Sequence, residues 1–170
     1  TTAGIAGTVD DALFQDERWT PGGSYTYEIP VANGTYLVDL LFAEIYSGIA
    51  GSGQRVFDMS LEGQALAALQ NIDVYSKVGP NAAYTITQTV TVSDGSLSIQ
   101  VGPGSSSPGN VENAKLNAFA VYGSTTTPPT ATVKQPAIIL VSGASGRDRD
   151  ETVSGIPIFG QLFHSKVRHL

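Results

Sequence analysis

The stretch FAEIYSGIAGSGQRVF, residues 42–57, predicts two β-strands joined by a surface loop. Apolar residues open and close it, and the residues between Tyr46 and Gln54 are small, with Ile49 the exception. A run of this kind cannot bury itself, so we expect it at the surface. An aromatic side chain beside a glycine-rich loop, held on rigid strands, is a common way to build a binding site. Tyr46 is therefore the first candidate ligand contact, and a loop-packing role for it stays open.

Alternating apolar residues on both sides of this loop predict an all-β domain. The alternation is clear in residues 24–31 and 35–43. It is clearest in residues 83–102, where Asp94-Gly95 between two alternating arms predicts a β-hairpin. Residues 115–123 predict one further strand. Short strands at regular spacing with glycine-based turns indicate a jelly-roll type β-sandwich, here with an extended C-terminal tail.

Three local expectations complete the fold prediction. Residues 55–66 predict two short strands around a Glu62-Gly63 turn, with Phe57 facing inward and Asp58 facing water. Residues 66–78 fit either a strand or one helical turn. Trp19, just before a Pro-Gly-Gly turn, is expected to be a core residue under the sheet, and a sugar-stacking role for it stays open.

Composition excludes several classes of protein. The chain has 170 residues, room for one domain or one domain plus an appendage. Its net charge of −6 argues against nucleic acids and anionic membrane surfaces as partners. It has no cysteine, so it has neither disulfides nor thiolate metal sites. No run approaches the roughly 20 apolar residues of a membrane-spanning helix.

Charge divides the chain into two parts. Residues 1–132 carry four bases and twelve acids, a net charge of −8, whereas residues 133–170 carry five bases and three acids, a net charge of +2. We expect three segments: a sandwich over residues 1–123, a stiff Thr/Pro-rich linker over 124–136, and a tail over 137–170 with one strand-like stretch.

Seven separated motifs resemble the malectin domain. In chain order they are LFQDERW (13–19), YEIPVANGTY (27–36), LFAEIY (41–46), GQRVFDMSLEG (53–63), VGPNAAY (78–84), DGSLSI (94–99) and VENAKLNAFAV (111–121). The resemblance runs over roughly residues 5–123 and implies a galactose-binding-like β-sandwich of the jelly-roll type. It also implies carbohydrate binding, because the animal founder binds glucose-containing oligosaccharides. Bacterial relatives occur beside glycoside hydrolases and in cell-surface proteins.

The resemblance implies a sugar site built from aromatics and an acid at loop ends. Tyr46 matches a binding Tyr of the family's A-E-x-Y motif. Three positions differ: Phe14 falls where a Tyr often stands, Ser47 where the animal protein has a second aromatic, and Glu112 where the family has Asp.

Such a site needs aromatic stacking on sugar CH faces and hydrogen bonds from charged groups to hydroxyls. The candidate carbohydrate-binding residues are Tyr46, Phe14, Glu44, Ser47, Glu112 and Arg55. Glu44 follows a core strand directly, and a buried acid needs a partner. We therefore expect Glu44 to form an ion pair with Arg18 or Arg55.

The sequence does not favour an enzyme. Both histidines, His164 and His169, lie in the tail, so no Ser-His-Asp arrangement is supported. The adjacent acids Asp10-Asp11 and Asp16-Glu17 are expected to be solvated rather than to form a glycosidase pair. We expect no cofactor, and a structural calcium held by loop carbonyls stays open.

The beginning of the chain departs from the family pattern. Malectin domains normally begin with an Asn-Ala-Gly-Gly strand, whereas this chain begins Thr1-Thr2, without Met. We therefore expect a processed or trimmed chain whose sheet has an open edge. The strand-like stretch Ala137–Val141 is the candidate to fill that edge, either by folding back or by inserting into a neighbouring copy.

Two functions are consistent with these observations. The first is a non-catalytic, lectin-like module of an extracellular or cell-surface protein, of bacterial type, that binds glucan-type oligosaccharide or polysaccharide through loop aromatics. The second is a structural subunit of a surface or filamentous assembly. There, strand complementation by a C-terminal strand would complete the sandwich of a neighbouring copy.

Overall fold

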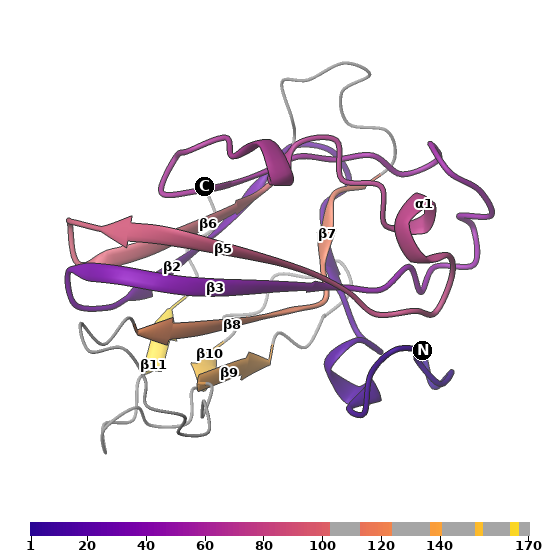
Figure 1. Ribbon diagram of the computed structural model, residues 1–170, viewed down its shortest axis with the longest axis horizontal. Helices are drawn as coiled ribbons and strands as arrows, with labels where there is room; N and C mark the ends of the chain where they lie inside the picture. The colour runs from indigo at the N-terminus through magenta and orange to yellow at the C-terminus, as the bar shows by residue number, and fades with distance from the viewer. Residues whose placement is uncertain (103–112, 124–136, 141–151, 155–163, 167–170) are drawn as a thin grey trace.

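The computed structural model describes residues 1–102, residues 113–123 and, in the tail, three strands (Figure 1). The described elements are mostly strands, with one short α-helix and two 3₁₀ turns. In chain order they are η1 (Asp11–Leu13), β1 (Arg18–Trp19), β2 (Tyr25–Pro30), β3 (Gly34–Phe42), β4 (Met59–Leu61), η2 (Ala67–Leu69), α1 (Val74–Val78), β5 (Tyr84–Val92), β6 (Ser96–Val101), β7 (Lys115–Leu116), β8 (Ala118–Gly123), β9 (Ala137–Leu140), β10 (Thr152–Ser154) and β11 (His164–Lys166).

Two antiparallel sheets form the sandwich. One has the strand order β5-β3-β8-β9 and the other the order β2-β6-β4. The inward-facing residues of β3, Val38, Leu40 and Phe42, are fully buried between the sheets. Tyr27 of β2 meets Phe119 of β8 across this core, with 5.3 Å between ring centroids. Each buried side chain of this size contributes roughly 1.5–3 kcal/mol. The predicted all-β sandwich is therefore confirmed.

The predicted hairpin at Asp94-Gly95 is wrong. β5 pairs with β3, whereas β6 lies in the other sheet between β2 and β4. The three residues Ser93–Gly95 therefore carry the chain from one sheet to the other. Val92 and Leu97, on either side of the crossing, both lie in the same core cluster. The alternation thus marks which side chains face the core, not which strands pair.

The predicted strand over residues 115–123 is broken at Asn117. β7 pairs with β1, and β8 pairs with β3. The break changes the phase of the alternation, so Leu116, Phe119 and Val121 all lie in the core cluster. Asn117 is itself buried, and its side chain is used as a structural connector, as described below.

Two expectations for residues 53–78 need correction or completion. Asp58 is buried rather than facing water, and it accepts a hydrogen bond from the backbone of Asn71 at 2.6 Å. Asn71 has a positive φ of 54°, so this bond secures a tight turn.

One strand, β4, forms where two were expected, ending at the predicted Glu62-Gly63 turn. Residues 74–78 form one helical turn, which the Asp73 side chain caps at Ser76 N.

The strand predicted in the tail is present as β9. Its backbone pairs antiparallel with β8 of the same chain, in the register Val121↔Ala137 to Ala118↔Leu140. It therefore folds back to form one edge of the four-stranded sheet. β10 and β11 pair with each other as a separate two-stranded sheet. The predicted linker over residues 124–136 lies outside the described residues, so its boundaries stay a prediction.

Candidate functional site

The loop that follows β3 is fixed at several points. Ile49 is buried, and its N–H donates to Tyr46 O at 3.0 Å to close a turn. The Gln54 side chain accepts from Ala50 N at 2.7 Å, and Asp73 accepts from Gly53 N at 2.7 Å. These bonds hold a loop of small residues in one conformation. Tyr46 projects from it with 53% of its surface exposed.

A buried ion pair lies beside the Tyr46 ring. Arg55 Nη1 donates to both oxygens of Glu44, at 2.9 and 3.0 Å. Tyr46 N donates to the same carboxylate at 3.1 Å, and the Arg55 guanidinium lies 5.7 Å from the Tyr46 ring centroid. The predicted ion pair of Glu44 is therefore confirmed, with Arg55 as its partner. Arg18 instead lies over the Tyr25 ring, 4.4 Å from its centroid.

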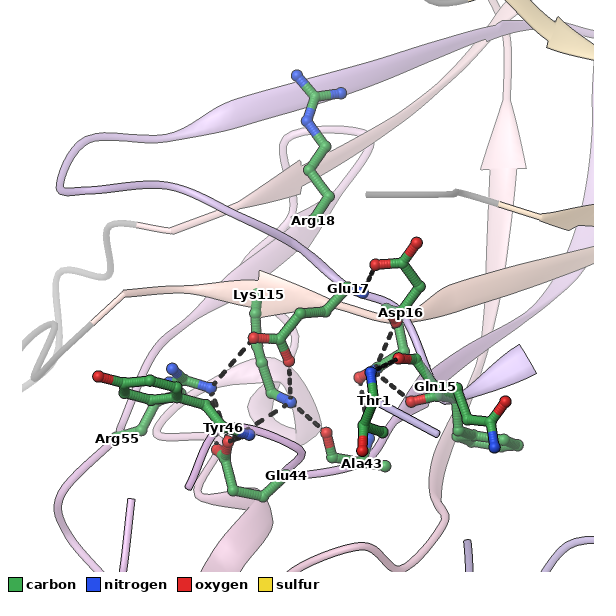
Figure 2. A network of polar contacts seen from close by, with 12 residues as sticks. Thr1, Gln15, Asp16, Glu17, Arg18, Ala43, Glu44, Tyr46, Arg55 and Lys115 are labelled. Carbon is green, nitrogen blue, oxygen red and sulfur yellow. Dashed lines mark hydrogen bonds and ion pairs between the residues drawn. The ribbon is translucent and has the colours of Figure 1, made fainter. Parts of the chain in front are cut away.

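The ion pair belongs to a cluster of four charged side chains that point toward one another (Figure 2). Lys115 Nζ donates to Glu17 Oε2 at 2.7 Å and to the carbonyl of Ala43, and it lies 3.9 Å from Glu44 Oε1. Arg55 Nη1 lies 3.8 Å from Glu17 Oε1. Burial lowers the pKa of Lys115, while the two carboxylates oppose that shift. The charges of two acids and two bases thus balance one another within a largely buried cluster.

Asn117 joins the N-terminal segment to this cluster. Its Nδ2 donates to the carbonyls of Phe14 and Asp16, at 2.9 and 2.8 Å. Its Oδ1 accepts from Ala43 N at 2.9 Å. Three backbone groups are thereby bonded, and Glu17 is held over Lys115. The break between β7 and β8 therefore makes the cluster possible.

Trp19 is not the core residue that we expected, because 41% of its surface is exposed. In the two-stranded ribbon of β1 and β7, Trp19 is directly opposite Lys115. Directly opposed residues place their side chains on the same face of a ribbon. Lys115 points into the cluster that carries Tyr46, so Trp19 lies on that face as well. The exposure of the indole was not predicted, because a Trp directly before Pro-Gly-Gly suggested packing in the core.

The structure brings four of the six predicted site residues together. Glu44, Arg55, Tyr46 and the exposed Ser47 lie in or beside the loop. Phe14 is 4% exposed and packs in a small cluster with Ile5 and Ala43, so its ring lies in the interior. Glu112 lies outside the described residues.

Two kinds of site or segment are absent from the described residues, and one buried donor stands out among them. Within residues 1–102 and 113–123, no three His, Asp or Glu side chains gather as a metal site would require. No described helix is long and apolar enough to cross a membrane. The Nε of Arg55 is buried and makes no hydrogen bond with any described residue, so a donor is left beside the Tyr46 ring.

A small pocket of about 120 Å³ lies away from this site. It is lined by residues of η1, β3, β5 and β8, among them Leu13, Leu41 and Ala118. Its polar groups are Thr85, Asp39 and Tyr122. Burial and the neighbouring Asp39 raise the pKa of Tyr122, so its hydroxyl stays neutral.

Comparison with known proteins identifies one family and a set of structural neighbours. The sequence model of the malectin domain family matches residues 1–119. No curated protein matches the chain. A β-glucuronidase of Bacteroides uniformis is similar in structure, with a TM-score of 0.59, 19% identity, and coverage of 74% of this chain and 13% of that chain.

Two plant structures are similar as well. The ANX2 ectodomain of Arabidopsis thaliana has a TM-score of 0.52 and 20% identity, with coverage of 61% of this chain and 30% of that one. Plant FER, in a complex with the peptide RALF23 and LLG2, has a TM-score of 0.55 and 22% identity, with coverage of 63% and 29%. At these identities the likeness shows the fold alone, and the chain spans less than a third of each neighbour.

Proposed function

This chain belongs to the malectin domain family, a family of carbohydrate-binding β-sandwich domains, and on that premise we propose that it is a non-catalytic module that binds glucan-type oligosaccharide or polysaccharide. The observation that carries the proposal is Tyr46, an exposed aromatic ring on a loop that hydrogen bonds and a buried ion pair hold in place. An immobilised ring of this kind stacks on the CH face of a pyranose at little entropic cost.

Trp19 extends the proposed site. It is exposed and directly opposite Lys115, whose side chain reaches Glu44 beside Tyr46. Two exposed aromatics on one face suit a ligand of more than one sugar unit. Arg55 supports the site from below, because its buried guanidinium is fixed by Glu44 and lies 5.7 Å from the centroid of the Tyr46 ring. Ser47 adds an exposed hydroxyl next to the ring.

The state of the carboxylates supports a binding role rather than hydrolysis. Glycosidases need two carboxyl groups that are free to exchange protons or attack the sugar. Here Glu44 is bonded to Arg55 and Glu17 to Lys115. Both carboxylates are therefore already engaged by a base of the same chain. We place the module in an extracellular or cell-surface protein of bacterial type, in line with the setting of its family.

Substitution of the two exposed aromatics tests the proposal. Tyr46→Ala and Trp19→Ala are each expected to weaken binding of a glucan oligosaccharide by about fivefold or more, because stacking on one ring contributes about 1 kcal/mol. Isothermal titration with gluco-oligosaccharides of increasing length measures this. Val9→Ala is the matched control, since Val9 is an exposed apolar residue outside the site and its loss should leave affinity unchanged. Wild-type affinity in both aromatic variants would rule the site out.

We propose as a second function a structural subunit of a surface assembly, in which β9 is exchanged between copies. This strand is added to the edge of β8 through backbone pairing, and 13 residues, 124–136, separate it from the end of β8. Adjacent antiparallel strands need a connection of only about 2–5 residues. A connection of this length leaves the β8 edge open to β9 of a second copy, which would add to it by the same backbone pairing.

Cysteine pairs test this exchange in a chain that has no native cysteine. Ala120 and Ile138 are opposite each other in the β8–β9 register. For the double variant Ala120→Cys/Ile138→Cys, strand exchange predicts disulfide-linked dimers and larger species whose share rises with protein concentration before oxidation. Non-reducing electrophoresis measures the share, and the two single-cysteine variants control for random oxidation. Monomeric disulfide alone at every concentration would exclude the assembly function.

A further inference from the structure

Gly48 lies against the ring of Tyr46. A Cβ atom on Gly48 would lie closest to Tyr46 Cε1, and it would come 2.6 Å from Cζ and 2.8 Å from Oη. These separations are shorter than real contacts allow, so no side chain can occupy position 48 while the ring stays where it is. The φ of Gly48 lies outside the left-handed region. The backbone therefore does not require glycine here, and the ring does.

The other glycines of the same loop have different reasons to be glycine. A Cβ on Gly51 would meet the Gln54 side chain at 3.6 Å, an ordinary contact, and Gly51 also lies outside the left-handed region. Gly53 has a φ of +77°, where an L-residue is strained. Gly48 is thus the glycine in this loop whose absent side chain makes room for Tyr46.

Further contacts hold Tyr46 in the same place. Its backbone N–H is bonded to Glu44, and its ring lies beside the guanidinium that Glu44 fixes (Figure 2). About half of the Tyr46 surface nevertheless faces solvent. The ring is therefore held in one orientation while it stays accessible. A ligand that stacks on a ring already held loses less entropy than one that must first order it.

We infer that Gly48 is a positioning residue for ligand binding, which fixes the Tyr46 ring in the orientation that a glycan stacks on. The inference rests on the proposed function. A methyl group at position 48 moves the ring rather than the backbone, since the atoms that it meets are at the end of an exposed side chain. Alanine at this position therefore removes the binding orientation and leaves the fold intact.

The test compares Gly48→Ala with Gly51→Ala and Tyr46→Ala, each titrated with the same gluco-oligosaccharide. Gly48→Ala is expected to weaken binding by about fivefold or more, as Tyr46→Ala does. Gly51→Ala should bind within twofold of wild type, as its Cβ has room. The thermal midpoints of both glycine variants should equal that of wild type. If Gly48→Ala binds normally while Tyr46→Ala does not, or if it unfolds at lower temperature, the positioning role is refuted.

An NMR measurement without ligand separates this inference from the proposed function. The Gly48 Hα protons lie against an aromatic ring, so their resonances should be displaced by its ring current. Tyr46→Leu should remove that displacement, and Gly48→Ala should shift the Tyr46 ring resonances while Gly51→Ala leaves them unchanged. A normal Gly48 Hα shift in wild type overturns the inference. Normal glycan binding by Tyr46→Ala overturns the proposed function, whatever the spectrum shows.

Discussion

Replacing Lys115 by Met is expected to lower the free energy of unfolding by about 3–5 kcal/mol, the usual cost of removing one partner from a buried ion cluster. Lys115 is fully buried and provides one of the two positive charges in the cluster. Met fills a similar volume, so little packing is lost. Glu17 and Glu44 would then share Arg55 alone, and the Ala43 carbonyl would lose its donor.

Urea unfolding, followed by tryptophan fluorescence and circular dichroism, measures this loss. Lys77→Met is the control, because Lys77 is an exposed lysine and its loss should change stability by less than about 0.5 kcal/mol. The double variant Lys115→Met/Glu17→Leu restores the charge balance and should lose less than the sum of its single variants. A loss below about 1 kcal/mol for Lys115→Met would show that the buried carboxylates do not need this base.

Replacing Asn117 by Ala should cost roughly 3 kcal/mol or more, since each buried polar group left without a partner costs about 1–3 kcal/mol. The carbonyls of Phe14 and Asp16 and the N–H of Ala43 would all lose their bonds. The N-terminal segment would also lose its side-chain link to Ala43, directly after β3. Asn33→Ala is the control, because Asn33 is exposed and makes one bond, to Ser93 O.

Hydrogen exchange gives this prediction a local readout. In the wild type, the Ala43 amide is bonded to a buried side chain and should exchange slowly. In Asn117→Ala it should exchange faster than the amides of central β3, beyond what the global loss of stability explains. Equal loss of protection at both places would mean that Asn117 contributes only to overall stability.

The sandwich was predictable because alternation in residues 24–31 and 35–43 reports burial directly. Tyr27, Val38 and Leu40 are buried as that pattern requires. The pairing of β5 and β6 was not predictable in the same way. Both strands turn their apolar side chains to one core. The same alternation would arise if the two strands were neighbours in one sheet or if they faced each other from two sheets.

The candidate site was predictable where the chemistry is local. Glu44, next to a core strand, needed a base, and Arg55 lies at the far end of the same loop. The roles of Lys115 and Asn117 depend on the break between β7 and β8, which the apolar periodicity of the sequence does not predict. Trp19 was misjudged for a related reason. Its exposure follows from the pairing of β1 with β7, residues almost 100 positions apart.

The crossing at Ser93–Gly95 also bears on how the chain folds. Tyr25 pairs with Val101, Gly34 with Val92, and Tyr36 with Gly123, so the partners in both sheets are far apart in sequence. Chains with such pairings lose the entropy of closing large loops before the strand contacts can offset that loss. They therefore fold in milliseconds to seconds. During synthesis, β2, β3 and β4 have none of these partners until β5, β6 and β8 have left the ribosome. The first of these pairings, β3 with β5, therefore becomes possible only once the chain up to Val92 has emerged, and the β2-β6-β4 sheet must wait for β6.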